Sequence, residues 1–351
     1  LKHIWGRTDL IPLWVADMDF ATAPFVTDAI RKRCENEVLG YTGKPDSYYN
    51  AIINWVKQRY DLIVTKEVIN FVPGIVPGIG MAMNCFTQKG DKVMIQPPVY
   101  HPFAWVTTRN ERTLVINPLK WENGMYRMDL DAFREQIKGC KLFILCNPHN
   151  PGGVVWTEAE LRAIADICYD EKVLVFSDEI HADLTLPPHT HRPFATVSEK
   201  ARMNSVTFMS PSKAFNMPGL SASHALIFNE DLRKRFRIYM DAGELDMGHV
   251  FAFLSVEAAY SHGTEWLDQC LAYIQGNIDF VDEFLKKHAP KIKAIRPEAS
   301  YLVWLDCREL ELSQKDLNEF FVDKPHLALN DGEMFGKEGI GFMRLNVASP
   351  R

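Results

Sequence analysis

The alternation of short apolar segments with helical stretches constrains the fold of this chain more than any other feature. Apolar segments typical of buried strands occupy residues 92–95, 113–116, 141–145, 173–176 and 205–209. A helical pattern covers residues 158–170, between two of these segments. Strands that are apolar on both faces and alternate with helices indicate a parallel or mixed sheet covered on both sides. The sequence therefore predicts an α/β protein.

Four of the predicted strands are followed directly by a cluster of polar or aromatic residues. These clusters are residues 96–100, 147–153, 177–181 and 210–216. Ligands of such sheets bind outside the carboxyl ends of the strands, where the clusters would meet. This convergence is the strongest functional signal in the sequence, and it predicts a binding or catalytic site at that edge.

The last cluster contains Lys213, flanked by Ser210 and Ser212, directly after an apolar strand. Lysine is rarely buried unless it is paired or chemically employed. Desolvation lowers the pKa of a lysine and leaves a nucleophilic amine, as Schiff-base chemistry requires. The two hydroxyl groups are suited to binding a phosphate, so the motif suggests a pyridoxal phosphate lysine. The motif is common by chance, and a solvated loop lysine is the alternative.

A second candidate phosphate site lies in residues 71–80, a segment rich in glycine and proline that leads into a helical pattern over residues 81–86. A turn that opens a helix offers free backbone N–H groups and the positive end of the helix dipole. The glycines do not match a dinucleotide-binding fingerprint. A plain loop-to-helix junction is the alternative.

Helical and strand patterns also occur outside these segments, and the part of the chain after residue 228 predicts a smaller α+β domain. Helical patterns cover residues 23–38 and 47–60, and a long one covers residues 248–288 with a break near 261–263. Strand patterns at residues 225–228, 301–305 and 341–347 and a helix near residues 313–322 complete the prediction. We expect a large domain over residues 38–260 and a small domain made of residues 1–37 and 261–351.

Arg344 stands among apolar residues in the last predicted strand. An arginine in such a place needs an anionic partner, and a substrate carboxylate held by two hydrogen bonds would serve. An internal salt bridge is the alternative.

Composition narrows the class of protein. The formal net charge of -6 over 351 residues, without a block rich in lysine and arginine, argues against a nucleic-acid partner. The seven cysteines are scattered without a CxxC motif, so neither a disulfide framework nor a metal site is expected. No apolar run approaches membrane-spanning length, and the first residues show no signal-peptide pattern. We expect a cytoplasmic protein with no membrane partner.

The order of these motifs resembles that of the fold-type I pyridoxal phosphate enzymes of the aminotransferase class I/II superfamily. Within it the chain is most similar to the cystathionine β-lyase-like C–S lyases of the MalY/PatB group. The likeness runs nearly end to end, and two stretches typical of that group are residues 14–20 and residues 178–181. The final helix that is usual in the family is missing, so we expect the native chain to extend further.

The resemblance implies pyridoxal 5′-phosphate as cofactor and assigns roles around its ring. Lys213 would form the Schiff base and then act as the base at the substrate Cα. Asp178 would pair with the pyridine nitrogen and keep it protonated. Tyr100 would stack on the ring, and Asn150 would hydrogen-bond its 3′-oxygen, with the Asn150–Pro151 peptide bond expected to be cis.

The resemblance also implies how the phosphate and the substrate are held. The backbone N–H groups of Ile75 and Val76, with Ser210 and Ser212, would bind the phosphate. Tyr41 would reach the phosphate and the substrate of a neighbouring subunit, which implies a homodimer with shared active sites. Arg344, with Asn150, would bind the α-carboxylate of a small amino-acid substrate.

Three histidines and one serine complete the set of candidates. Ser221 occupies a position where aminotransferases often carry a phosphate-binding arginine, and His181 replaces a tyrosine near the 3′-oxygen. Both departures match the C–S lyase group, and His181 is equally suited to a structural role. His189 and His191 have an HxH spacing without an acidic or cysteine companion nearby, which favours a surface loop.

The resemblance implies α,β-elimination from a sulfur-bearing L-amino acid, which yields a thiol, pyruvate and ammonia. Lys213, Asp178 and Tyr41 would be the catalytic residues. The same residues permit transamination, so an aminotransferase is the alternative. A regulatory binding protein that retains the fold is an alternative from a different class.

Overall fold

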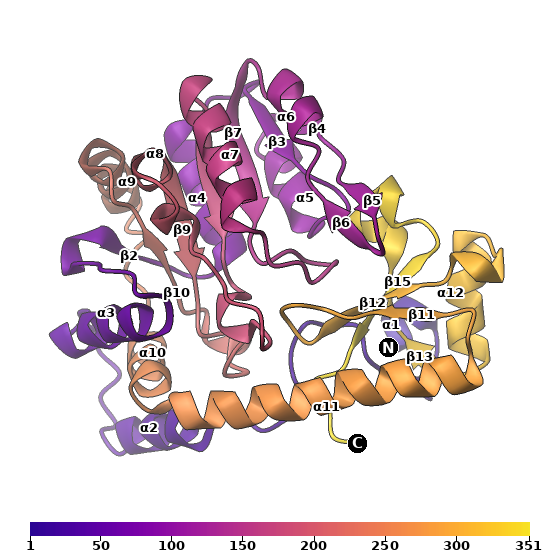
Figure 1. Cartoon of the computed structure of the whole chain (residues 1–351). Helices are drawn as coiled ribbons and strands as arrows, with labels where there is room; N and C mark the ends of the chain where they lie inside the picture. Colours follow the sequence, from indigo (N-terminus) through magenta and orange to yellow (C-terminus); the bar gives the residue numbers. More distant parts are fainter.

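A mixed sheet of seven strands forms the centre of the computed structural model, which describes all 351 residues (Figure 1). Its strands, in spatial order, are β2 (Ile69–Val72), β10 (Ser223–Leu226), β9 (Ser205–Met209), β8 (Leu174–Asp178), β7 (Cys140–Cys146), β3 (Lys92–Ile95) and β4 (Thr113–Ile116). All neighbouring pairs are parallel except those that β10 makes with β2 and β9. The predicted fold class is confirmed.

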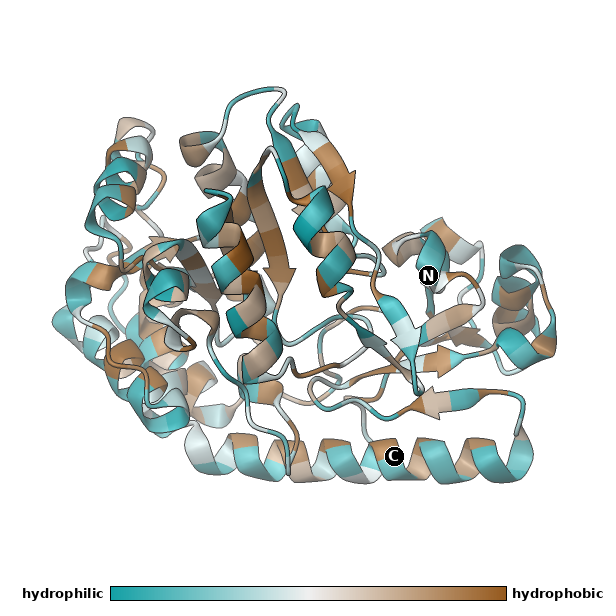
Figure 2. Ribbon diagram, turned by 45° about the horizontal axis from the view of Figure 1, so that its top comes forward, coloured by the Kyte–Doolittle hydropathy of each residue, from teal (hydrophilic) through white to brown (hydrophobic).

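Helices cover both faces of this sheet, because the side chains of each strand alternate between two apolar cores. On β7, Leu142 and Ile144 belong to one core, whereas Phe143 and Leu145 belong to the other. The first core is closed by α4 (Ile75–Phe86), α5 (Pro102–Arg109) and α9 (Glu230–Ala242); the second is closed by α6 (Leu130–Gln136), α7 (Glu158–Asp170) and α8 (Glu199–Met203). Figure 2 shows the central strands as predominantly apolar and the covering helices as mixed.

A second, antiparallel sheet of four strands lies beside the first (Figure 1). Its strands, in order, are β11 (Lys293–Ile295), β12 (Leu302–Asp306), β15 (Phe342–Asn346) and β14 (Asn330–Asp331), and α12 (Gln314–Asp323) accompanies them. The long helix α11 (Thr264–His288) runs along the base of the molecule beneath both parts. The expected domain boundaries at residues 38 and 260 stay a prediction.

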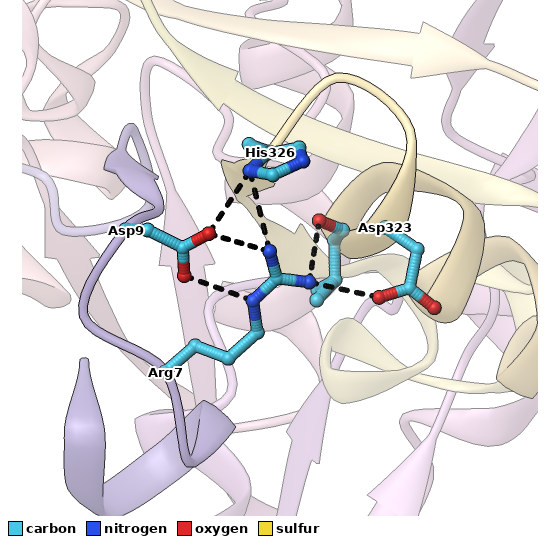
Figure 3. A network of polar contacts seen from close by, with 5 residues as sticks. Arg7, Asp9, Asp323 and His326 are labelled. Atoms are coloured by element: carbon cyan, nitrogen blue, oxygen red, sulfur yellow. Dashed lines mark hydrogen bonds and ion pairs between the residues drawn. The ribbon is translucent and has the colours of Figure 1, made fainter.

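The N-terminal segment is attached to the second part of the molecule. After α1 (Lys2–Trp5), strand β1 (Ile11–Pro12) pairs in parallel with β13 (Leu327–Ala328). The Arg7 guanidinium donates to both carboxylate oxygens of Asp9 and to Asp323, and His326 lies 3.1 Å from Asp9 (Figure 3). The segment that follows contacts both parts of the molecule, because Asn346 on β15 donates to the carbonyl of Asp17 and Asn216 donates to the carbonyl of Phe20.

The predicted helix over residues 248–288 is confirmed as α10 (Val250–His262) and α11, separated at Gly263. The first predicted helix, α2 (Pro24–Cys34), ends earlier than expected, and α3 (Asp46–Tyr60) agrees with its prediction. The strand predicted at residues 225–228 is β10, which covers Ser223–Leu226.

The helix predicted at residues 81–86 begins six residues earlier, at Ile75. The sequence pattern was misleading because Pro77 and the glycines suggested a turn. Proline is tolerated in the first turn of a helix, where its missing N–H has no intrahelical partner to lose. None of the helices combines the length and apolar character that crossing a lipid bilayer requires.

Candidate active site

A cavity of about 220 Å³ lies at the carboxyl ends of β7, β8 and β9, where the polar clusters were expected to meet. Its walls include most of the predicted site residues. They are Ile75, Val76, Tyr100, Asn150, Asp178, His181, Ser212, Lys213 and Ser221, together with Ala16, Pro73, Gly74, Pro77, Cys146, Ile180, Pro218 and Ser223. The clusters that follow separate strands are therefore brought together, as predicted.

Lys213 follows β9, and its partly buried amine points across the cavity to the backbone of the N-terminal segment. The amine donates a hydrogen bond to the carbonyl oxygen of Ala16. Burial, reinforced by the nearby Arg344 charge, lowers the pKa of Lys213 to about 8. No carboxylate forms an ion pair with this amine, so about a tenth of it is neutral and nucleophilic at pH 7, far more than for an ordinary lysine. The solvated-loop alternative for Lys213 is thereby excluded.

Asp178 ends strand β8 on the floor of the cavity and is fully enclosed. One carboxylate oxygen accepts the N–H of Ile180 at 3.1 Å, and no cationic side chain pairs with the carboxylate. Burial raises the pKa of Asp178 to about 7, with a further upward contribution from neighbouring Glu179. A carboxyl group in this state favours a ligand that brings a positive charge next to it.

An anion cradle forms where α4 begins. Gly74 caps the helix at φ 143°, a conformation that glycine adopts readily and other residues rarely do. Because no side chain caps this end, the N–H groups of Ile75 and Val76 are free to face the cavity, whereas Pro77 has none to offer. Two free N–H groups at the positive end of a helix of 12 residues favour an anion.

The serines divide into two groups. Ser212, Ser221 and Ser223 line the cavity, whereas Ser210 lies behind it. The Ser210 hydroxyl donates to the carbonyl of Ala222 at 2.7 Å and also accepts the backbone N–H of Ser212 at 3.1 Å. Ser210 therefore positions Ser212 rather than reaching the cavity itself.

Arg344 is buried on β15, and no carboxylate pairs with it. Its guanidinium donates to the side-chain oxygen of Asn150 at 3.1 Å, to the side-chain oxygen of Asn330, and to the carbonyl of Trp14 at 3.0 Å. The Nε group is buried without a hydrogen-bond partner, and burial lowers the pKa of Arg344 to about 10. The alternative of an internal salt bridge is excluded, and a buried cation without an anion is left for a ligand.

Asn150 and Tyr100 line the same cavity as Lys213, and Asn150 accepts a hydrogen bond from Arg344. The Asn150–Pro151 peptide bond is cis, as expected. Tyr100 forms an edge contact with Phe103 at 5.7 Å between ring centroids. Burial, followed by the Asp178 charge, raises the pKa of the Tyr100 hydroxyl, which therefore stays protonated.

His181 is buried beside these groups, and its Nδ1 atom has no partner. Burial and the charges of Lys213 and Arg344 lower the pKa of His181 to about 3. The imidazole is therefore neutral and can donate or accept one hydrogen bond within the cavity wall.

The expectation that His189 and His191 form a surface loop is wrong for His191. Its side chain is buried, and its Nε2 atom lies 2.8 Å from the Glu179 carboxylate, which also accepts from Ser177 and from the N–H of Phe194. The acidic companion is twelve residues away in sequence, so local spacing did not reveal it. His189 is half-exposed, as expected.

Tyr41 does not belong to the cavity of its own chain. It is 97% exposed on the loop between α2 and α3, near a separate hollow formed with residues 247–251. Its predicted role therefore depends entirely on a second subunit.

Sequence reasoning missed the backbone of residues 14–16 and the side chain of Asn330. The carbonyls of Trp14 and Ala16 accept from Arg344 and Lys213, and Asn330 orients the guanidinium. Every residue type has a backbone carbonyl, so the sequence gives no sign of which carbonyls lie in the site. Asn330 lies in a strand of only two residues, which is too short to recognise from its pattern.

These residues fit pyridoxal phosphate. A lysine amine with a lowered pKa suits an aldehyde, an enclosed unpaired carboxyl group suits a protonated ring nitrogen, and the cradle at α4 suits a phosphate. A sheet covered on both faces, with this set at its strand ends, defines the class of fold-type I pyridoxal phosphate proteins.

The chain belongs to the aminotransferase class I and II family, whose model matches residues 8–351. It is 39% identical to cystathionine β-lyase PatB of Bacillus subtilis, over 98% of this chain and 90% of PatB. It is 30% identical to protein MalY of Escherichia coli, over 99% of this chain and 89% of MalY. The solved structure of cystalysin from Treponema denticola, which contains pyridoxal 5′-phosphate, superimposes with a TM-score of 0.95 at 35% identity, over 98% of this chain and 88% of cystalysin.

Proposed function

We propose that this protein cleaves the Cβ–S bond of sulfur-bearing L-amino acids by α,β-elimination, with Lys213 as the base. Substrate and one water molecule give a thiol, pyruvate and ammonia. The protein is a pyridoxal phosphate-dependent carbon–sulfur lyase. The likeness to cystathionine β-lyase PatB over nearly the whole chain carries this conclusion, because the site residues alone serve elimination and transamination equally.

The cofactor is pyridoxal 5′-phosphate, which supplies an electron sink for negative charge at Cα when it is bound. Asp178 holds the positive charge at the ring nitrogen, and the cation in turn keeps the enclosed carboxyl group ionised. Tyr100 would pack on the ring, and Asn150 and His181 would hydrogen-bond its 3′-oxygen; all three line the cavity. Ile75 and Val76 bind the phosphate through their N–H groups.

Ser212 completes the phosphate contacts, and Ser210 acts by holding Ser212 in place. Ser221 lines the same cavity with no charge to offer. The phosphate is therefore held by hydroxyl groups, backbone N–H groups and the dipole of α4 rather than by an arginine.

Lys213 and Arg344 act on the substrate. Arg344 donates to the α-carboxylate, with Asn150 fixing the orientation of the guanidinium. Lys213 takes the Cα proton, since an amine with a pKa of about 8 is an effective base near neutral pH. Before this step the amine must leave the Ala16 carbonyl, which holds it in the structure.

The active form of the enzyme is a homodimer whose two subunits share their active sites. The enzyme is located in the cytoplasm. Exposed apolar side chains gather around Tyr41, with Val38 71%, Leu39 63% and Met247 44% exposed. A surface of this kind favours coverage by another protein chain. Tyr41 on that surface contributes to the phosphate and substrate of the partner subunit.

The test is an assay of the protein loaded with pyridoxal phosphate, given L-cystathionine and no keto acid. We expect pyruvate and free thiol to accumulate in equal amounts over many turnovers. A half-reaction that stops until a keto acid is added would make the protein an aminotransferase instead. If the folded protein with bound pyridoxal phosphate catalyses neither reaction, the regulatory alternative is favoured.

A further inference from the structure

Residues 14–20 form a strap that both parts of the molecule hold by its backbone. Arg344 donates to the carbonyl of Trp14 at 3.0 Å, and the amine of Lys213 donates to the carbonyl of Ala16. Ala16 also lines the cavity. The strap therefore contacts both residues that the proposed reaction uses on an amino acid, the base for Cα and the cation for the carboxylate.

Asn346, two residues after Arg344 on β15, holds the first half of the strap. Its side-chain amide donates to the carbonyls of Val15 and Asp17 at 2.6 Å each, one residue on either side of Ala16. Both N–H groups of this buried amide are thus engaged. The backbone around Ala16 is thereby fixed to the strand that carries the arginine.

Asn216, three residues after Lys213, holds the second half of the strap. Its amide donates to the carbonyls of Met18 and Phe20 at 2.9 and 2.7 Å, and its side-chain oxygen accepts the N–H of Met18 at 3.0 Å. Its backbone has φ 52°, a left-handed conformation that asparagine tolerates better than most residues. The segment that carries the lysine is thus attached to the strap by three hydrogen bonds.

The two asparagines make the same kind of bridge, from one amide to the carbonyls of residues i and i+2. A third bridge of this kind lies outside the strap. Asn277 on α11, which is also buried, donates to the carbonyls of Val347 and Ser349 at 2.8 and 2.9 Å. Asn277 therefore offers a matched control for the loss of one such bridge.

The spacing of the lysine and the arginine decides whether they can act on one amino acid. Lys213 follows a strand of the seven-stranded sheet, whereas Arg344 lies on the four-stranded sheet. The carboxylate that the arginine binds is bonded to the Cα whose proton the lysine removes. A displacement of about 1 Å in such an arrangement can cost about 100-fold in rate. A segment that contacts both residues is well placed to prevent it.

We propose that Asn216 and Asn346 are positioning residues, which act through the strap to hold Lys213 and Arg344 at the spacing that one amino acid requires. The inference rests on the proposed function for the roles of the lysine and the arginine. It concerns transfer of the Cα proton to the lysine amine, the step with which elimination and transamination both begin.

The test measures exchange of the Cα hydrogen of L-alanine with deuterium from the solvent, in the protein loaded with pyridoxal phosphate. L-Alanine has no leaving group at Cβ, so the exchange reports proton removal in a lyase and in an aminotransferase alike. The variants are Asn216→Gly, which suits the left-handed backbone, Asn346→Ala and the control Asn277→Ala. Cofactor affinity is followed by absorbance titration, and stability without cofactor by urea unfolding.

We expect the exchange rate at saturating L-alanine to fall about tenfold in Asn216→Gly and in Asn346→Ala, and by less than about twofold in Asn277→Ala. Cofactor affinity should change by less than about twofold in all three, because no hydrogen bond joins the strap to Asp178 or to the start of α4.

The double variant Asn216→Gly/Asn346→Ala should exchange about as slowly as the slower single variant, because each change releases the same strap. The two changes should likewise be non-additive in urea unfolding of the protein without cofactor. Additive effects in both measurements would overturn the proposal.

Two other results would overturn it as well. One is a wild-type exchange rate in either strap variant. The other is an equal loss of exchange in Asn277→Ala, which would indicate general loosening. Should the smaller side chains prevent folding, Asn216→Asp and Asn346→Asp keep the size of the side chain and remove both donors, and the same criteria apply. Failure of the pyruvate assay would refute the proposed function separately, because the exchange test uses no sulfur-bearing substrate.

Discussion

In the absence of cofactor, the Asp178→Asn variant should be more stable than the wild type, and it should bind the cofactor more weakly. The carboxyl group has a pKa of about 7 in the folded chain, against 3.8 as its ordinary value, because it is buried without a cation. The difference is about three pKa units, and each unit corresponds to about 1.4 kcal/mol, so ionisation costs the folded state about 4 kcal/mol. Asparagine can still accept the N–H of Ile180 and carries no charge to desolvate.

The sign of the pH dependence follows from the raised pKa. Between pH 3.8 and about 7 the folded state binds more protons at this site than the unfolded state, so stability falls as pH rises. The free energy of unfolding of Asp178→Asn should exceed that of the wild type by about 1.5 kcal/mol at pH 5 and about 4 kcal/mol at pH 8.

The assay is urea unfolding of both proteins without cofactor at pH 5, 6.5 and 8, with Asp19→Asn as an exposed control for the loss of one negative charge. Cofactor affinity is measured in parallel by absorbance titration and should fall in Asp178→Asn. A variant that is less stable than wild type at pH 8, or a difference that does not grow with pH, would refute the reasoning.

Three further predictions concern single side chains. Lys213→Ala should reduce pyruvate release by roughly a thousandfold, because it removes the base at Cα; a variant with wild-type turnover would contradict the mechanism. Arg344→Lys should raise the KM for the amino-acid substrate roughly 30-fold in steady-state assays, because the variant loses one charge-assisted hydrogen bond of about 2 kcal/mol to the substrate carboxylate. An unchanged KM would mean that the carboxylate binds elsewhere. His191→Ala should lower the free energy of unfolding, measured in urea, by about 3 kcal/mol, because it leaves Glu179 buried without its histidine partner. His189 is half-exposed, so His189→Ala should change the free energy of unfolding by less than about 0.5 kcal/mol. Equal effects of the two substitutions would contradict the buried pair.

Several features of the site could be predicted because they depend on residue type and strand position. The polar clusters follow apolar strands, and the carboxyl ends of neighbouring parallel strands meet at one edge of a sheet. Lys213, Asp178 and Asn150 could thus be placed together from the sequence alone. The start of α4 was misjudged because Pro77 signals a turn and a first helical turn equally well.

Other features depend on contacts between residues far apart in the chain. The partner of His191 is Glu179, the partner of Lys213 is the carbonyl of Ala16, and neither pairing has a signature in local spacing. The lowered pKa of Lys213 likewise depends on burial, which only the packed structure defines.

The sequence by itself indicated the α/β class and most strands of the central sheet, because hydrophobic periodicity is a local property, and it placed Lys213, Asp178 and Asn150 in the polar clusters that follow those strands. Tertiary structure alone decided that Arg344 lacks an anion, that Asp178 is enclosed without a cation, and that the carbonyl of Ala16 accepts a hydrogen bond from Lys213. The physical reason is that desolvation and electrostatic interaction depend on distance in space, and folding sets those distances.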